Sequence, residues 1–284
     1  MKFLKSLLPT ILVIIVGIAI YFLYTRNDKL AGEKISSEES AVEQENKDPE
    51  QQVPQNTHKT YAETPAENGA LYFEKFPVIQ TQQAYIAYPL TIDTKTPPTL
   101  VIYNHGSNTN VTKNLKDPFM KDLQAYAKYL TTKGFAFAAS NQHGMNYGNT
   151  ASIQDSKNLI EWIKKEYMIK EKVNMLGFSM GGLPAIYYAV KYPSEVNAMA
   201  LLAPVTYIWG SSIYTPIKNI PTKIWHGTRD VNVGYSASSG YIERGKPYKI
   251  NTVLRTVQDA GHFNIDTEFM KEIYDFFKEN EISN

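Results

Sequence analysis

The stretch that decides the fold is Val173-Asn174-Met175-Leu176-Gly177-Phe178-Ser179-Met180-Gly181-Gly182. Its first four residues form a short, mostly apolar run of the kind found in buried strands. Residues 183–192 then have the spacing of a helix, which Pro193 ends. A serine with glycine at both ±2 positions therefore lies between a strand and a helix. This is the context of a tight turn that presents a nucleophilic serine, because a side chain at either flanking glycine would clash.

Strands and helices are predicted to alternate on both sides of this turn. The expected strands are 71–76, 83–88, 100–103, 135–139, 198–202, 222–225 and 251–257, and the other expected helices are 119–130, 152–167 and 268–277. Such alternation predicts an α/β fold whose mostly parallel sheet, of about eight strands, has helices on both faces. In these folds active sites gather at the carboxyl ends of the strands.

Two of those strand ends carry an acid and a histidine. His226-Gly227-Thr228-Arg229-Asp230 follows one strand, and Asp259-Ala260-Gly261-His262 follows another. Imidazole can take and return a proton near neutral pH, which suits His262 to the role of base, and a carboxylate can orient it. Asp230 is the preferred acid. Asp259 is the alternative, although it lies only three residues from His262 on the same loop.

Four segments together resemble the α/β-hydrolase superfamily of serine esterases and peptidases. They are Asn-His-Gly-Ser-Asn at 104–108, Gly-Phe-Ser-Met-Gly-Gly at 177–182, His-Gly-Thr-Arg-Asp at 226–230 and Asp-Ala-Gly-His at 259–262. The resemblance covers the chain from about residue 69 onward. It implies a catalytic triad of Ser179, Asp230 and His262. It also implies an oxyanion hole formed by the backbone N–H groups of Met180 and Ser107.

The resemblance implies hydrolysis of carboxylic esters through an acyl-enzyme, and the partner is then a small-molecule acyl substrate. A peptidase, an acyltransferase and a non-catalytic binding protein on the same fold remain alternatives. No His/Asp/Glu group has metal-ligand spacing and no glycine-rich nucleotide loop follows a strand, so neither a metal nor a cofactor is expected. His105 and His226 are expected to hold loops rather than to react.

The substrate pocket is less well defined by the sequence. Segment 205–221 is too short for a large lid, which predicts an open site with a minimal lid. Tyr207, Trp209 and Tyr214 on this segment are candidate pocket walls, with core packing as the alternative. His143, on the loop after strand 135–139, is a further candidate, with a structural role as the alternative.

The N-terminal part of the chain differs in character. Residues 7–24 carry no charge and are long enough to span a bilayer, which predicts a single-pass membrane anchor over residues 1–26. Lys2 and Lys5 favour a catalytic domain outside the cytoplasm, and a cleaved signal peptide with secretion is the alternative. Residues 27–68 are acidic and polar and are expected to be a flexible linker to a catalytic domain over 69–284.

Composition excludes several other classes of protein. The 284 residues include 29 Lys and Arg against 28 Asp and Glu, a net charge of +1, and no basic stripe that would indicate nucleic-acid binding. Cysteine is absent, which excludes disulfide bonds and a thiolate nucleophile.

Overall fold

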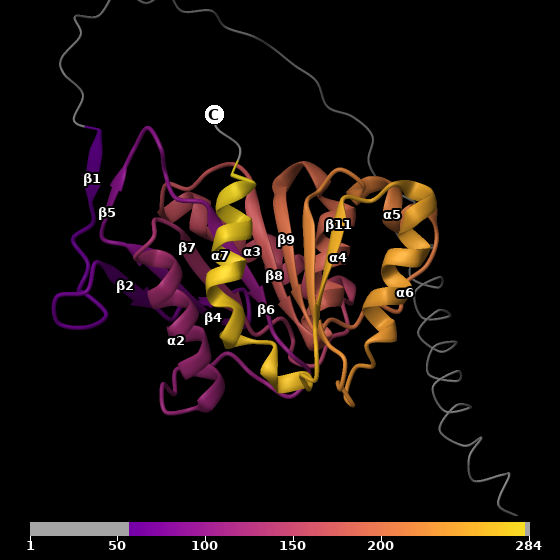
Figure 1. The fold of residues 1–284 in the computed structure, drawn as a ribbon. Helices are drawn as coiled ribbons and strands as arrows, with labels where there is room; N and C mark the ends of the chain where they lie inside the picture. The colour runs from indigo at the N-terminus through magenta and orange to yellow at the C-terminus, as the bar shows by residue number, and fades with distance from the viewer. Residues whose placement is uncertain (1–56, 282–284) are drawn as a thin grey trace, which may run out of the picture. The chain divides into compact units, whose positions relative to one another are not determined.

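A mixed sheet forms the centre of the structure, a computed structural model that describes residues 57–281 (Figure 1). The strand order is β11-β10-β9-β8-β6-β7-β4-β2, and β3 pairs with β4 outside this path. The strands are β2 Tyr72–Lys75, β3 Val78–Ile79, β4 Gln82–Pro89, β6 Leu100–Asn104, β7 Ala136–Ser140, β8 Val173–Phe178, β9 Val196–Leu202, β10 Thr222–Gly227 and β11 Thr252–Val257.

The strands that carry the expected site are parallel. From β7 across β6, β8, β9 and β10 to β11, every neighbouring pair runs in the same direction. Strands β4 and β2 are antiparallel to their neighbours, which makes the sheet mixed. The carboxyl ends of the parallel strands therefore meet at one edge, the lower edge in Figure 1, where the loop from β11 to α7 turns.

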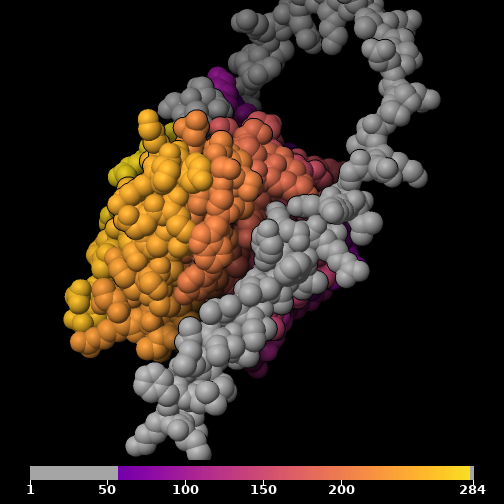
Figure 2. Space-filling model, turned by 90° about the vertical axis from the view of Figure 1, so that its right-hand side faces the viewer, coloured from indigo at the N-terminus to yellow at the C-terminus, as the bar shows by residue number. Residues whose placement is uncertain are grey.

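Helices cover both faces of the sheet. They are α2 Pro118–Thr131, α3 Thr150–Glu166, α4 Gly182–Lys191, α5 Ser211–Ile217, α6 Ser236–Gly245 and α7 Met270–Glu279. Helices α2 and α7 pack on one face, and α3 to α6 pack on the other. Alternating side chains of each strand feed the two cores, so Ile102 of β6 lies in one core and Val101 and Tyr103 in the other. Figure 2 shows the end of the domain where the segments from β9 to β11, coloured orange to yellow, form the surface.

The folded domain begins earlier than the expected boundary at residue 69. Strand β1, His58–Thr60, pairs antiparallel with β5, Thr91–Asp93. The ring of Tyr61 then packs edge-on against Tyr88, with ring centroids 5.1 Å apart. Residues 58–61 of the expected linker over 27–68 therefore contact the folded domain.

The expected membrane anchor at residues 7–24 lies outside the described residues. Within 57–281, none of the helices combines the length and the apolar character that a bilayer crossing requires. Helix α6 was not predicted, since its serine- and glycine-rich sequence has little helical periodicity.

Candidate active site

The nucleophile turn begins where β8 ends. Ser179 has a φ of +54°, in the left-handed region that residues with a Cβ rarely adopt. A Cβ added at Gly181 would lie 1.9 Å from the carbonyl oxygen of Asn104, and one added at Gly177 would lie 2.5 Å from that of Gly181. Both glycines are therefore required by the close approach of backbone, and the turn stores strain at the serine.

His262 and Asp230 meet from two different loops. The Nδ1 atom of His262 lies 2.6 Å from Oδ2 of Asp230, and both side chains are buried. The other carboxylate oxygen, Oδ1, accepts hydrogen bonds from the backbone N–H groups of Asn232 at 2.9 Å and Val233 at 2.8 Å. The carboxylate is thus fixed in orientation and holds the imidazole through Nδ1, which leaves Nε2 for proton transfer.

Asp259, the alternative acid, points elsewhere. Its Oδ1 atom lies 2.9 Å from the guanidinium of Arg229 in an exposed ion pair. Among the described contacts it makes none with the imidazole of His262, so Asp230 and not Asp259 is the carboxylate that contacts this histidine.

His226 is a second buried histidine beside Asp230. Its Nε2 lies 2.8 Å from the carbonyl oxygen of Val233 and 3.3 Å from Oδ2 of Asp230, while Nδ1 lies 2.6 Å from the hydroxyl of Ser238. A carbonyl only accepts, so Nε2 carries the hydrogen and the Ser238 hydroxyl donates to Nδ1. Burial has the largest effect on the pKa of His226 and lowers it. The hydrogen bond to the Val233 carbonyl and the charge of Asp230 act to raise this pKa. A neutral His226 therefore lies beside the carboxylate of Asp230 and supports it.

His105 holds a loop, as expected. Its Nδ1 atom lies 2.7 Å from the carbonyl oxygen of Gly106, and its Nε2 atom lies 2.9 Å from that of Asn141. This connects the ends of β6 and β7.

His262 lies next to the turn at Ser179. The rings of Phe178 and His262 have centroids 5.0 Å apart, and Phe178 directly precedes Ser179. Neither Ser179 Oγ nor His262 Nε2 has a hydrogen-bond partner among residues 57–281. Both atoms are thus available, and such contacts commonly tighten only when substrate binds.

The loop after β6 approaches the same turn. A Cβ added at Gly106 would lie 3.4 Å from the Phe178 ring and 3.8 Å from Cβ of Ser179. Ser107 follows directly, and its backbone N–H donates to no other group in the described part of the chain. Met180 follows Ser179 in the turn Ser179–Gly181. Gly106, the residue before Ser107, therefore lies beside Ser179, and Met180 directly follows Ser179 in the chain.

Two of the candidate pocket residues, Tyr207 and Trp209, are exposed. The backbone N–H of Val205 donates to the carbonyl of Ser179 at 2.8 Å, so the segment that carries Tyr207 and Trp209 starts at the nucleophile. Tyr207 is 50% exposed and Trp209 is 64% exposed, with the guanidinium of Arg244 stacked 5.2 Å from the Trp209 ring.

Tyr214 lies in the core instead. It is fully buried on α5, where its ring packs against Tyr241 and Tyr248 with centroid distances of 5.4 and 5.3 Å. Its hydroxyl donates to the carbonyl of Ile208 at 3.1 Å. The prediction that Tyr214 lines the pocket is therefore wrong, because α5 turns this side chain inward.

His143 pairs with an acid outside the triad. Its Nδ1 atom lies 2.5 Å from Oδ2 of Asp155, and its backbone N–H donates to Oε1 of Gln82 at 2.9 Å. Burial raises the pKa of the Asp155 carboxyl, and the bond to His143 opposes this. His143 makes no contact with Ser179, Asp230 or His262 among the contacts of the described chain. These contacts make it part of the loop's own structure.

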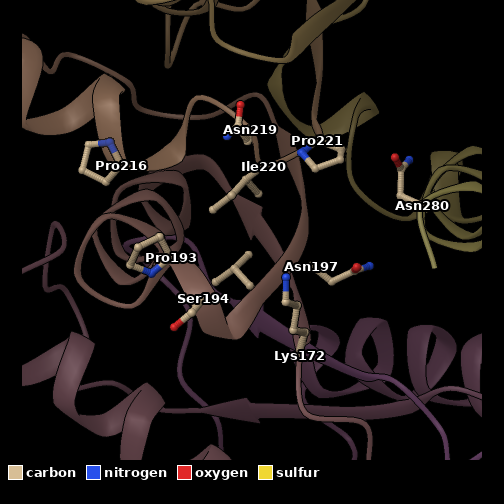
Figure 3. A pocket seen from close by; sticks show the side chains of 10 residues that line it. Lys172, Pro193, Ser194, Asn197, Pro216, Asn219, Ile220, Pro221 and Asn280 are labelled. Carbon is tan, nitrogen blue, oxygen red and sulfur yellow. The ribbon is translucent and has the colours of Figure 1, made fainter. Parts of the chain in front are cut away.

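The opposite edge of the sheet holds a separate cavity of about 530 Å³ (Figure 3). It lies where β8, β9 and β10 begin and is lined by Lys172, Pro193, Asn197, Ile220 and Asn280, among others. None of the triad side chains lines it. Within residues 57–281 no three His, Asp or Glu side chains come together as metal ligands.

Comparison with known proteins agrees with the fold. Residues 99–223 match the family model described as the alpha/beta hydrolase fold. "Serine hydrolase BPHL" of Mus musculus is 28% identical over 125 residues, which cover 41% of this chain and 38% of the mouse protein. The aligned region thus spans well under half of that relative.

Solved structures resemble a larger part of the chain. An esterase of Pyrococcus furiosus is 17% identical with a TM-score of 0.56, covering 78% of this chain and 97% of that one. An S-formylglutathione hydrolase of Agrobacterium tumefaciens is 15% identical with a TM-score of 0.57, covering 74% and 94%. The sequence match over residues 99–223 and these structural likenesses show that the chain has the α/β-hydrolase fold.

Proposed function

We propose that this protein is a serine hydrolase that cleaves carboxylic esters through an acyl-enzyme. The observation that carries the proposal is the buried 2.6 Å contact between His262 and Asp230 beside the strained turn at Ser179. The matched relatives support it, since they include proteins named as a serine hydrolase and as esterases.

In the proposed reaction, Ser179 Oγ attacks the ester carbonyl while Nε2 of His262 takes the hydroxyl proton. The backbone N–H groups of Met180 and Ser107 stabilise the oxyanion of the tetrahedral intermediate. His262 then gives the proton to the departing alkoxide, and the acyl group remains on the serine. Water, deprotonated by His262, attacks the acyl carbon; the bond between this carbon and Ser179 Oγ then breaks, His262 returns the proton to Ser179 Oγ, and the carboxylic acid leaves.

The surface around the triad favours an apolar acyl group. Val231 directly follows Asp230 and is 92% exposed, and Phe263 directly follows His262 and is 77% exposed. We call the exposed apolar side chains on the loops after β7, β9, β10 and β11 the apolar rim; they are Met145, Tyr147, Tyr207, Trp209, Val231 and Phe263. Two rim residues, Val231 and Phe263, directly follow Asp230 and His262, and the ring of Phe263 lies 6.5 Å from that of Phe178, which precedes Ser179. An acyl chain would bury this surface during each turnover and leave with the product.

Hydrolysis of p-nitrophenyl esters of increasing chain length, compared with aminoacyl anilides, tests the proposal. We expect esters to be cleaved and kcat/KM to rise from acetate to octanoate. Trp209→Ser should lose this rise while keeping activity on acetate, and Val253→Ser, an exposed apolar control on β11, should match wild type. Cleavage of anilides without cleavage of esters would overturn the ester assignment in favour of a peptidase. A flat chain-length profile would overturn the role of the rim alone.

We further propose that residues 7–24 hold the enzyme in a membrane, with the catalytic domain outside the cytoplasm. The support is the uncharged length of this segment and the lysines that precede it.

A further inference from the structure

Asp266 is a partly buried carboxylate that the reaction above does not use. It lies four residues after His262, on the same loop. Its Oδ2 and Oδ1 atoms lie 3.0 and 3.2 Å from the hydroxyl of Tyr103, and Oδ1 also lies 2.9 Å from the hydroxyl of Tyr126. The Tyr126 hydroxyl is equally close to the backbone carbonyl of Asp266, at 2.9 Å. Both tyrosine side chains are fully buried.

These two tyrosines belong to the scaffold of the active site. Tyr103 is the penultimate residue of β6, and the next residue, Asn104, places its carbonyl against Gly181 of the nucleophile turn. Tyr126 lies on α2, which covers that face of the sheet. The carboxylate of Asp266 therefore joins the loop that carries His262 to strand β6. This strand contacts the turn at Ser179 and leads into the loop that carries Ser107.

The loop itself has little regular structure to hold it. His262–Asn264 and Thr267–Phe269 are two single 3₁₀ turns, and Asp266 lies between them. Ile265, its neighbour, is fully buried and adds an apolar contact. Contacts at 265 and 266 therefore hold the segment that follows His262, whereas before it the carbonyl of Ala260 accepts a hydrogen bond from the backbone N–H of Arg229 at 3.0 Å.

An apolar side chain at this site would be buried at a lower free-energy cost than the carboxylate of Asp266. Burial raises the pKa of Asp266 to about 6, while the hydrogen bonds from Tyr126 and Tyr103 act to lower it and Asp122 on α2 raises it further. Among the described residues no cation contributes to its stabilisation. The hydrogen bonds from two hydroxyls to this carboxylate fix the orientation of the loop rather than add net stability to the fold.

We propose that Asp266 is a positioning residue, which sets the place of His262 relative to Ser179 by accepting hydrogen bonds from Tyr103 and Tyr126. This inference rests on the proposed roles of Ser179 and His262. Labelling of wild type with a fluorophosphonate tests those roles, and the comparison of variants tests the anchor.

The first test is Asp266→Asn, with Asp259→Asn as the matched control on the same loop. The amide accepts from one hydroxyl, but its N–H group can only donate, so the second tyrosine hydroxyl would have to change from donor to acceptor and the loop should shift. A displacement of about 1 Å at a reacting group can cost up to roughly 100-fold in rate. We therefore expect kcat on p-nitrophenyl acetate to fall by roughly 10- to 100-fold with KM little changed. Asp259→Asn should match wild type.

A spectroscopic readout separates positioning from loss of structure. The far-downfield proton resonance of the His262–Asp230 hydrogen bond should shift or disappear in Asp266→Asn, while the thermal melt stays cooperative. Wild-type kcat and an unchanged resonance in Asp266→Asn would overturn the proposal. If this variant fails to fold, Tyr103→Phe with Tyr126→Phe removes only the two hydroxyls. This double variant should show the same fall in kcat. A double variant with the kcat of wild type would equally overturn the proposal.

Discussion

Replacement of Gly181 by alanine is the smallest change that tests the geometry of the nucleophile turn. The added methyl carbon would lie 1.9 Å from the carbonyl oxygen of Asn104 and 2.5 Å from its carbonyl carbon. Both atoms are backbone at the end of the central strand β6, so no side chain can rotate away. The turn and the strand must therefore separate by roughly 1.5 Å to reach ordinary van der Waals distance.

The cost of that separation can be estimated. Inserting a methyl group into a packed site typically costs about 1 to 3 kcal/mol, and contact with fixed backbone places Gly181→Ala at about 3 kcal/mol. For a domain of this size, 1 kcal/mol lowers Tm by about 2 to 4 °C, which predicts a fall of about 6 to 12 °C. Because Ser179 moves with the turn, kcat/KM should fall by roughly 100-fold.

Differential scanning calorimetry and hydrolysis of p-nitrophenyl acetate measure the two effects. Gly234→Ala is the matched control, since its added Cβ would meet only the hydroxyl of Ser236 at 3.5 Å. We expect the control to keep both Tm and activity. A Tm for Gly181→Ala equal to that of the control would refute the reasoning, because it would mean that the turn and β6 do not approach as closely as the structure has them.

Three further predictions concern the acid, the carboxylate of Asp266 and the N-terminus. Asp230→Asn should lower kcat by about 10³- to 10⁴-fold, because the amide favours the wrong tautomer of His262, and wild-type kcat would exclude Asp230 as the acid. The pKa of Asp266 is raised from 3.8 to about 6 in the folded protein, so its stabilising contribution is full below pH 4 and lost as the pH rises through 6. The free energy of unfolding of wild type relative to Asp266→Asn should therefore fall by on the order of 2 kcal/mol between pH 4 and 7 in chemical denaturation, and a constant difference would contradict the shift. Deletion of residues 1–56 should move the enzyme from the membrane fraction to the soluble fraction, whereas a soluble full-length protein with a shortened N-terminus would indicate a cleaved signal peptide.

Local patterns were enough to predict the turn at Ser179. The requirement for glycine at 177 and 181 comes from backbone contacts within or beside the turn, and the strand and helix around it have clear periodicity. The partnership of Asp230 and His262 could be predicted for a different reason. Each follows a strand of a parallel sheet, and such strand ends meet at one edge.

Contacts between distant elements could not be predicted in the same way. Tyr214 lies on a seven-residue helix with a proline inside it, which is too short to indicate which side faces the core. Asp266 meets Tyr126 across 140 residues of chain, so nothing near it in the sequence indicates this contact. His226 was expected to be structural, and only the packed structure shows that it supports Asp230.

The central claim is that Ser179 is a nucleophile activated by His262. Its most direct test is labelling of the folded protein with a fluorescent fluorophosphonate, comparing wild type with Ser179→Ala and His262→Ala. We predict rapid labelling of wild type, none of Ser179→Ala and strongly slowed labelling of His262→Ala, with all three showing the same cooperative melt. Equal labelling of wild type and Ser179→Ala, or none of folded wild type, would contradict the account.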